Sequence, residues 1–324
     1  MPSTPATTAL YTDLLSIACA VTRKSFACAS PTIANISSTL NLVLLGILSP
    51  LLVMIVMDFL NNKVGDPEEV EQKTRIPLLG VISHIRRIKS SIIISRSNRS
   101  VVSEQIRTLR TSIGFTGGGK EARKILVTSA QPGDGKSFIS INLAASYALL
   151  GKKTVLVELD LRKPHVSKYL NITSKQGISS ILSGKAQMKD VLVEVPEFDG
   201  LLHLLPAGYL PPNPAELISM PNMEKLINEL EAQFDYVIID TPPFGLVTDA
   251  ILLQRYADIT LAVLRQGHTN KDAYKQLNQR ITQKADYPIY AVLNGVGWRK
   301  RYQRGYGYGN YSYAYGKGYF EEEQ

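Results

Sequence analysis

The stretch from residue 124 to residue 150 constrains the fold of this 324-residue chain more than any other. An apolar, β-branched run, Lys124–Ser129, leads into Ala130-Gln131-Pro132-Gly133-Asp134-Gly135-Lys136-Ser137, and a helix is predicted over Lys136–Leu150. This order reproduces the pattern G-x-x-x-x-G-K-[ST], with Ala130 in the first glycine position. Glycines let backbone N–H groups turn toward phosphate oxygens, and the following helix adds its dipole. The stretch therefore predicts a phosphate-binding loop (P-loop).

The motif also predicts which residues contact a nucleotide. Lys136 is expected to reach the β- and γ-phosphates, and the hydroxyl of Ser137 is expected to bind Mg²⁺. The residues predicted to bind the nucleotide are Gln131, Gly133, Asp134, Gly135, Lys136, Ser137 and Phe138.

Two further apolar strands end in acidic residues. Tyr236–Asp240 is followed by Thr241-Pro242-Pro243, and a carboxylate at this point beside a P-loop is suited to hold Mg²⁺ through its water shell. Val155–Leu159 leads into Asp160, and Glu158 lies two residues before it. Residues two apart on a strand face the same side, so Glu158 and Asp160 are expected to converge near one metal or one acceptor group.

The pattern between residues 104 and 301 indicates the fold class. Further strands are predicted at Leu201–Leu205, Ile259–Leu264 and Ile289–Leu293, and further helices at Met223–Phe234 and Lys271–Lys284. Short, continuously apolar strands covered by helices on both faces indicate a mostly parallel, doubly wound sheet. The predicted fold class is an α/β P-loop NTPase.

A stretch without charged residues runs from Ser25 to Met57. Its most apolar part lies within residues 40–60, which is about the length of a membrane-spanning helix. A buried core helix is the alternative, but such a helix normally has a polar edge. We therefore expect a transmembrane helix at residues 40–60. Residues 72–103 carry seven basic and no acidic residues, so the positive-inside rule places the C-terminal part in the cytoplasm.

Charge and cysteine content narrow the choice of partners. The chain has 36 Lys and Arg against 28 Asp and Glu, a formal net charge of +8, which indicates an anionic partner. Much of the excess positive charge lies directly after the predicted membrane span, where it determines the topology. It is therefore no argument for a nucleic-acid partner. Cys19 and Cys28 are the only cysteines, which excludes a disulfide framework.

Taken in order, the motifs resemble those of the bacterial tyrosine kinases (BY-kinases) of capsule and exopolysaccharide assembly. That family carries a P-loop of the form SAxPGxGKS, an acidic strand ending DxDxR and a strand ending DTPP; here Glu158 replaces the first Asp of DxDxR. The resemblance runs from about Leu42 to the C-terminus and includes residues 61–67, 204–217 and 244–250. It implies a protein-tyrosine autokinase that uses ATP and Mg²⁺.

The resemblance also implies roles for the matching residues. Lys136 corresponds to the phosphate-binding lysine, and Ser137 and Asp240 to the Mg²⁺ contacts. Asp160 corresponds to the acid that activates the incoming tyrosine hydroxyl, and a phenol with a pKa near 10 needs such a base or a cation. Arg162 is a further catalytic residue that either stabilises the transferred charge or pairs with Glu158, and both interpretations stay open. Glu158 is a further catalytic or metal-binding carboxylate.

Helix residues before the P-loop match the family's ExxRxxR motif, which mediates ring formation between subunits. The matching residues, Glu104, Arg107 and Arg110, share one face of a helix. The alternative is an intrahelical salt-bridge face.

Seven of the 16 tyrosines lie in the last 23 residues, interleaved with Gly and Ser. Such a segment is expected to be a disordered tail with exposed hydroxyls. We interpret it as the substrate, phosphorylated in trans; the alternative is a low-complexity tail that binds RNA or polysaccharide by stacking. The predicted acceptors are Tyr302, Tyr306, Tyr308, Tyr311, Tyr313, Tyr315 and Tyr319.

The expected organisation has five parts. They are an unassigned segment (1–39), a transmembrane helix (40–60), a basic cytoplasmic linker (61–103), the kinase domain (104–301) and the tail (302–324). Family members usually have an earlier span and a large external domain, so we expect a truncated, fused or fragmentary version. The expected location is the inner membrane, with the kinase domain in the cytoplasm.

The expected partners are other copies in a ring, polysaccharide export and polymerase machinery and a cognate tyrosine phosphatase, without nucleic acid. One alternative function is a membrane scaffold whose assembly state depends on nucleotide. Another is a partition or positioning ATPase. That class has a lysine directly after the first P-loop position, where this chain has Gln131.

Overall fold

The computed structural model describes residues 43–53, 62–65, 67–73, 76–85, 90–95, 98, 100–116, 121–244, 249–282 and 288–297. The chain divides into two compact units, Met1–Asn62 and Lys63–Gln324, and each is described by itself. In the first unit, residues 43–53 form a helix whose apolar side chains are mostly exposed. None of the helices in the described ranges combines the length and the apolar character needed to span a bilayer. The rest of the predicted span, residues 1–39 and the tail at 302–324 lie outside the described residues.

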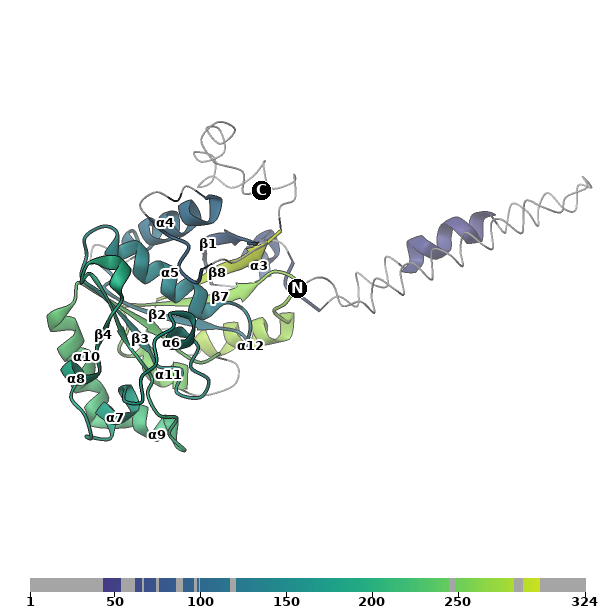
Figure 1. The fold of residues 1–324 in the computed structure, drawn as a ribbon. Coiled ribbons are helices and arrows are strands. Elements are labelled where there is room, and N and C mark those ends of the chain that lie inside the picture. Colours follow the sequence, from purple (N-terminus) through teal and green to yellow (C-terminus); the bar gives the residue numbers. More distant parts are fainter. Residues whose placement is uncertain are drawn as a thin grey trace, which may run out of the picture. The chain divides into compact units, whose positions relative to one another are not determined.

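Within its described residues, the second unit forms an eight-stranded sheet with the order β1-β8-β7-β2-β6-β3-β5-β4 (Figure 1). Neighbouring strands are parallel except for β4, which runs antiparallel to β5 at one edge. The strands are β1 (Leu78–Ser83), β2 (Lys124–Ser129), β3 (Thr154–Glu158), β4 (Val193–Glu194), β5 (Leu202–Leu205), β6 (Tyr236–Asp240), β7 (Ile259–Arg265) and β8 (Ile289–Val296).

Helices connect the strands. They are α3 (Pro67–Lys73), α4 (Val101–Gly114), α5 (Lys136–Ala148), α6 (Val166–Tyr169), α7 (Ile178–Leu182), α8 (Met188–Val191), a 3₁₀ turn (Pro196–Phe198), α9 (Pro214–Ser219), α10 (Pro221–Gln233), α11 (Asp249–Gln254) and α12 (Lys271–Thr282).

Strand β2 shows how the sheet is buried on both faces. Ile125 and Val127 belong to an apolar cluster that also contains Ile106 of α4. Leu126, between them, belongs to a second cluster that contains Ile227 of α10. Successive side chains of a strand point to opposite faces, so helices cover both sides of the sheet. The predicted α/β fold with a mostly parallel sheet is confirmed.

Most predicted strands match the structure closely. Lys124–Ser129 and Tyr236–Asp240 have the predicted bounds, whereas Ile289–Leu293 extends to Val296. The strand predicted to end at Leu159 ends one residue earlier, at Glu158. This early end has a consequence at the active site, because side-chain alternation stops where the strand stops.

The folded unit begins earlier than the predicted boundary at residue 104. The region predicted as a linker, 61–103, contains α3 and β1, and β1 pairs in parallel with β8. Helix α4 begins at Val101, after Ser100, whose hydroxyl accepts a hydrogen bond from the Ser103 N–H. The prediction of a linker is therefore wrong for α3, β1 and the start of α4. The run Leu78–Ser83 is short and lies among basic residues, which hid its pairing with a strand more than 200 residues later.

Candidate active site

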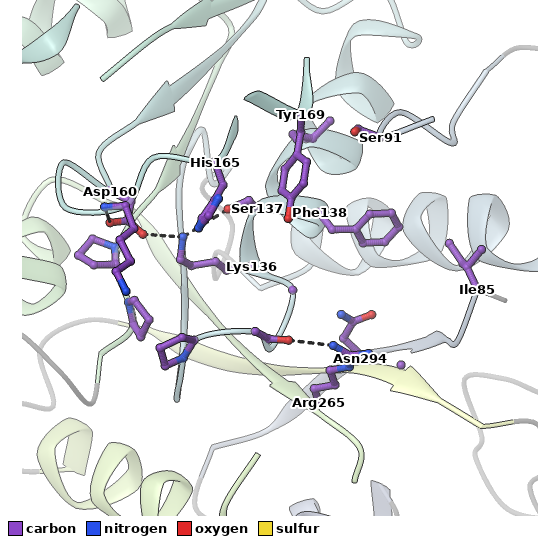
Figure 2. Close-up of a pocket in the computed structure, with 18 of the residues that line it drawn as sticks. Ile85, Ser91, Lys136, Ser137, Phe138, Asp160, His165, Tyr169, Arg265 and Asn294 are labelled. Atoms are coloured by element: carbon purple, nitrogen blue, oxygen red, sulfur yellow. Dashed lines mark hydrogen bonds and ion pairs between the residues drawn. The ribbon is translucent and has the colours of Figure 1, made fainter. Parts of the chain in front are cut away.

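A pocket of about 510 Å³ opens at the carboxyl ends of the parallel strands. The P-loop follows β2, Asp160 follows β3 and Pro242–Pro243 follow β6, and all three line the pocket. Figure 2 shows Lys136 near its centre, with Asp160 on one side and Phe138 on the other. Ligands of open α/β sheets bind at this end of the strands, so this is the place where a nucleotide site is expected.

The P-loop has a backbone shape that only glycine adopts easily. Gly133 and Gly135 have φ values of 88° and 98°, and a Cβ on Gly135 would lie 2.1 Å from Nδ2 of Asn294. Asn294 Nδ2 donates to the carbonyl of Asp134 at 2.9 Å. Arg265 Nη1 donates to the carbonyl of Gly133 at 3.1 Å (Figure 2). Carbonyls that would repel a phosphate are thus bound by donors from β7 and β8. The loop N–H groups and the start of α5 remain to bind phosphate oxygens.

Lys136 lies between the carboxylate of Asp160, which lines the pocket, and that of Asp240, which is fully buried. Its Nζ is 2.9 Å from Asp160 Oδ2 (Figure 2) and 3.3 Å from Asp240 Oδ2. The hydroxyls of Ser137 and Ser140 donate to the two oxygens of Asp240 at 2.9 and 3.0 Å. The structure therefore brings Lys136, Ser137, Asp160 and Asp240 together as predicted. Ser140, one helical turn after Lys136, is an addition that no motif indicated.

Burial and charge oppose each other in this group. Burial raises the pKa of Asp240, although Lys136 and the hydroxyls of Ser137 and Ser140 act against that rise. Burial by itself lowers the pKa of Lys136, but attraction to Asp240 and Asp160 outweighs it, so the net pKa is raised. Lys136 therefore stays protonated and carries the positive charge that a phosphate requires.

Two predicted nucleotide contacts, Gln131 and Asp134, do not line the pocket with their side chains. The carboxylate of Asp134 is fully buried and accepts hydrogen bonds from the Gln131 N–H (2.9 Å), Thr269 Oγ1 (2.6 Å) and His268 Nδ1 (3.1 Å). The side chain of Gln131 donates to the His268 carbonyl at 2.9 Å. Burial raises the pKa of Asp134. Both side chains therefore hold the P-loop against residues 268–269, away from the pocket.

The loop after β7 (residues 266–270), which contacts the P-loop, is hydrogen-bonded to the start of the folded unit. The Val64 N–H donates to the Thr269 carbonyl at 2.8 Å, and the Gly267 N–H donates to the Val64 carbonyl at 2.9 Å. A continuous set of hydrogen bonds therefore runs from Val64 through Thr269 to Asp134 of the P-loop.

Glu158 lies away from the pocket. Its fully buried carboxylate accepts hydrogen bonds from the N–H groups of Val166 (2.6 Å), Ser167 (3.1 Å) and Ala207 (3.2 Å), and from the Ser167 hydroxyl. The predicted convergence of Glu158 and Asp160 on one metal is wrong, because the carboxylate of Glu158 binds these groups outside the pocket and only Asp160 lines it. Glu158 instead anchors the start of α6.

Arg162 lines the pocket and pairs with a residue far away in the sequence. Its Nε and Nη2 lie 2.8 and 3.2 Å from the carboxylate oxygens of Asp249. The proposed alternative of a pair with Glu158 is therefore wrong. Asp249 fell within the stretch 244–250 of the family resemblance, but no role had been assigned to it.

A cation site formed by protein side chains alone is not found in the described part of the chain, where no three His, Cys, Asp or Glu side chains gather as ligands. Ser137 and Asp240 suit Mg²⁺, which takes one or two protein ligands and completes its shell with phosphates and water.

The three residues of the ExxRxxR motif have partners within their own unit. Arg107 pairs with Glu104 in α4 and donates from Nη2 to the carbonyl of Ser95 at 2.8 Å. Arg110 donates to the carbonyl of Ser146 on α5 at 2.8 Å. The intrahelical pair is present, and the contact between subunits stays a prediction.

Comparisons with known proteins agree with this geometry. Residues 122–287 match the family described as AAA domain. The chain is 36% identical over 220 residues to the tyrosine-protein kinase YwqD of Bacillus subtilis, an alignment that covers 68% of this chain and 92% of that one. The crystal structure of the chimerical protein CapA2B2 superposes with a TM-score of 0.67 at 33% identity, covering 72% of this chain and 100% of that one. The kinase domain of the Escherichia coli tyrosine kinase ETK gives a TM-score of 0.66 at 29% identity, covering 75% and 99%.

Fold and site together define a P-loop protein of the α/β class. The chain belongs to the family of bacterial tyrosine-protein kinases.

Several residues of the site were not predicted from the sequence, because no motif assigns a role to them. They are Ser140, Asp249, Arg265, His268, Thr269 and Asn294. Their position in the sequence could have indicated them, since several of these polar residues lie at or just after the carboxyl end of an apolar strand.

Proposed function

We propose that this chain is an ATP- and Mg²⁺-dependent protein-tyrosine kinase that phosphorylates the tyrosine cluster at its own C-terminus. The observation that carries the proposal is the position of Lys136 at the start of α5, where its amine lies between Asp160, which lines the same pocket as the P-loop, and the fully buried Asp240. When bound, ATP supplies the phosphoryl group and Mg²⁺ neutralises its charge. The predicted acceptors are Tyr302, Tyr306, Tyr308, Tyr311, Tyr313, Tyr315 and Tyr319.

The residues around Lys136 have separate tasks in this reaction. The P-loop N–H groups and Lys136 bind the phosphates, and Ser137 and Asp240 hold the cation. Asp160 accepts the proton of the tyrosine hydroxyl as the new O–P bond forms and the bond between the β- and γ-phosphates breaks. Catalysis then depends on positioning and on charge neutralisation, as is usual for phosphoryl transfer.

The cellular setting that we propose comes from the sequence and from the family. The uncharged stretch Ser25–Met57 supports attachment to the inner membrane, with the kinase domain (from Lys63, where the folded unit begins) in the cytoplasm. Glu104, Arg107 and Arg110 support a ring of copies, in which one copy phosphorylates the tail of the next. The proposed role is control of exopolysaccharide or capsule polymerisation and export, reversed by a tyrosine phosphatase.

Phosphosite mapping tests the proposal. The full chain is incubated with ATP and Mg²⁺ and digested, and phosphotyrosine is located by mass spectrometry, with a chain that ends at residue 301 as the control. Phosphate is expected on several residues of the tail in the full chain and on none of them without ATP. A full chain that binds ATP but carries no phosphate between Tyr302 and Tyr319 would contradict the proposal.

A further inference from the structure

Arg162 and Asp249 form an ion pair between two segments of the active site. Arg162 follows Asp160 by two residues after β3, and Asp249 opens α11, the helix that follows β6 and Asp240. Arg162 Nε lies 2.8 Å from Asp249 Oδ2, and Nη2 lies 3.2 Å from Oδ1. The pair therefore joins the segment that carries the base to the segment that follows the cation ligand.

The two partners differ in exposure. Asp249 is 1% exposed and does not line the pocket, whereas the side chain of Arg162 is 41% exposed and does line it. A guanidinium has five N–H donors, and the contacts with Asp249 use two of them, one on Nε and one on Nη2. Among the described residues, the other three donors of the guanidinium have no hydrogen-bond partner, and a planar edge of this kind matches phosphate oxygens.

Asp249 is held by the core on which α11 rests. Two residues of the same helix are fully buried in apolar clusters: Leu253 in the cluster that contains Leu126 of β2, and Ala250 in a further cluster. A buried carboxylate is costly unless it is paired with a cation or hydrogen-bonded, so Asp249 gains from a charged donor at this position. Arg162 supplies it, and the rigid carboxylate in turn fixes the plane of the guanidinium.

We propose that Asp249 is a positioning residue for the phosphoryl transfer, which holds the free N–H edge of Arg162 toward the phosphoryl group as it passes to tyrosine. The inference rests on the proposed kinase activity. Asp249 itself touches no substrate and acts through Arg162 alone. In the loose transition state of phosphoryl transfer, the charge of the transferred group is spread over its three equatorial oxygens, and a fixed donor edge aimed at that geometry stabilises it more than bound ATP.

A double-mutant cycle tests this assignment in the full chain. Rates of tail phosphorylation and KM for ATP are measured for wild type, Asp249→Asn, Arg162→Ala and the double variant. We expect Asp249→Asn to lower kcat by up to about 100-fold, as for a misplaced catalytic group, and to leave KM for ATP within about threefold. The double variant is expected to be no slower than Arg162→Ala, because Asp249 has no effect without its arginine.

Two further variants separate positioning from folding. Arg162→Lys keeps a cation beside Asp249 but loses the planar edge, so it is expected to keep the wild-type melting temperature and to lower kcat as Arg162→Ala does. Asp258→Asn changes an acid at the opposite end of the sheet, before β7, and is expected to leave kcat unchanged.

Three results would overturn the assignment. They are a wild-type kcat in Asp249→Asn, a wild-type kcat in Arg162→Lys, and a double variant whose loss is the product of the single losses. Absence of tail phosphorylation in wild type is a different result, which refutes the kinase function itself.

Discussion

Buried carboxylates on the two sides of the P-loop have different kinds of partner. On the pocket side, Asp160 and Asp240 lie 2.9 and 3.3 Å from the amine of Lys136, a cation that incoming phosphates also attract. On the bracing side, Asp134 accepts hydrogen bonds from Thr269 at 2.6 Å and from the Gln131 N–H at 2.9 Å, which hold the loop to its neighbour. The comparison teaches that burial alone does not separate the proposed catalytic acids from Asp134. The partner, a lysine in one case and hydrogen-bond donors of the P-loop and the neighbouring loop in the other, separates them.

Glu158 has partners of the same kind as Asp134, although it anchors α6 and not the P-loop, and we group it with the bracing side for this reason. Three main-chain N–H groups and one hydroxyl take up its carboxylate, so it has the partners of a structural anchor. It lies only two residues from Asp160, which has Lys136 as its partner. Variants on the pocket side are therefore expected to lose activity, and those on the bracing side to lose stability.

The largest effect is expected from Lys136→Met. Loss of the buried ammonium removes the charge that faces the phosphates, so tyrosine phosphorylation is expected to fall by at least about 100-fold. Phosphotyrosine formation is measured by radiolabel from ATP, and circular dichroism checks that the chain is folded. Lys152→Met, which removes an exposed lysine after α5, is the matched control and should retain the wild-type rate. Equal rates in the two variants would remove Lys136 from the mechanism.

Glu158→Gln is expected to separate stability from activity. The amide keeps the shape but replaces an acceptor oxygen by an N–H₂ group that meets other donors, so the free energy of unfolding should fall by about 1–3 kcal/mol. Below its melting transition, the folded variant should keep a kcat near that of wild type. Urea denaturation measures the loss, with the exposed Glu197→Gln as control. Wild-type stability combined with lost activity would contradict the structural role and indicate that Glu158 acts in the active site.

The raised pKa of Asp134 predicts a pH dependence of stability. Burial raises this pKa above the ordinary value of 3.8, so between 3.8 and the raised value the folded chain binds a proton that the unfolded chain lacks. The free energy of unfolding must then rise as the pH falls through this window. Wild type should therefore gain stability relative to Asp134→Asn as the pH is lowered from 7 toward 4. Urea titrations at several pH values measure the difference; a constant or shrinking difference contradicts the assignment.

The smallest effect is expected from His268→Ala. The imidazole is 41% exposed, and Gln131 and Thr269 still donate to Asp134 without it. Partly exposed pairs contribute about 0–1 kcal/mol, so stability should change by less than about 1 kcal/mol and the Kd for ATP by less than about fivefold. Isothermal titration calorimetry measures the Kd. A loss of ATP binding would mean that His268 contacts the nucleotide.

The pocket side was largely predictable from sequence, and the bracing side was not. Lys136, Ser137 and Asp240 belong to local motifs in which the strand, the loop and the helix are contiguous. Most partners of Asp134 and Glu158 are main-chain N–H groups and hydroxyls, with His268 as an additional partner of Asp134, and no residue type identifies which main-chain group faces a carboxylate. Alternation along β3 misplaced Glu158 because it assumed a strand that continues to Asp160.

Long-range pairing explains the other differences. Strand β1 is short and lies among basic residues, and only its pairing with β8 makes it part of the sheet. Asp249 is 87 residues from Arg162 in the sequence, and packing of α11 brings the two together. Neither contact has a local pattern that would predict it.

Single-turnover transfer of phosphate to tyrosine, measured at saturating ATP with equal amounts of folded protein, compares the two sides of the P-loop most directly. The variants are Asp160→Asn, which removes the proposed base, and Asp134→Asn, which changes a buried acid of the bracing side. We predict a rate at least about 100-fold below wild type for Asp160→Asn, and one within about threefold of wild type for Asp134→Asn. A wild-type rate for Asp160→Asn, or equal losses in both variants, would contradict the account.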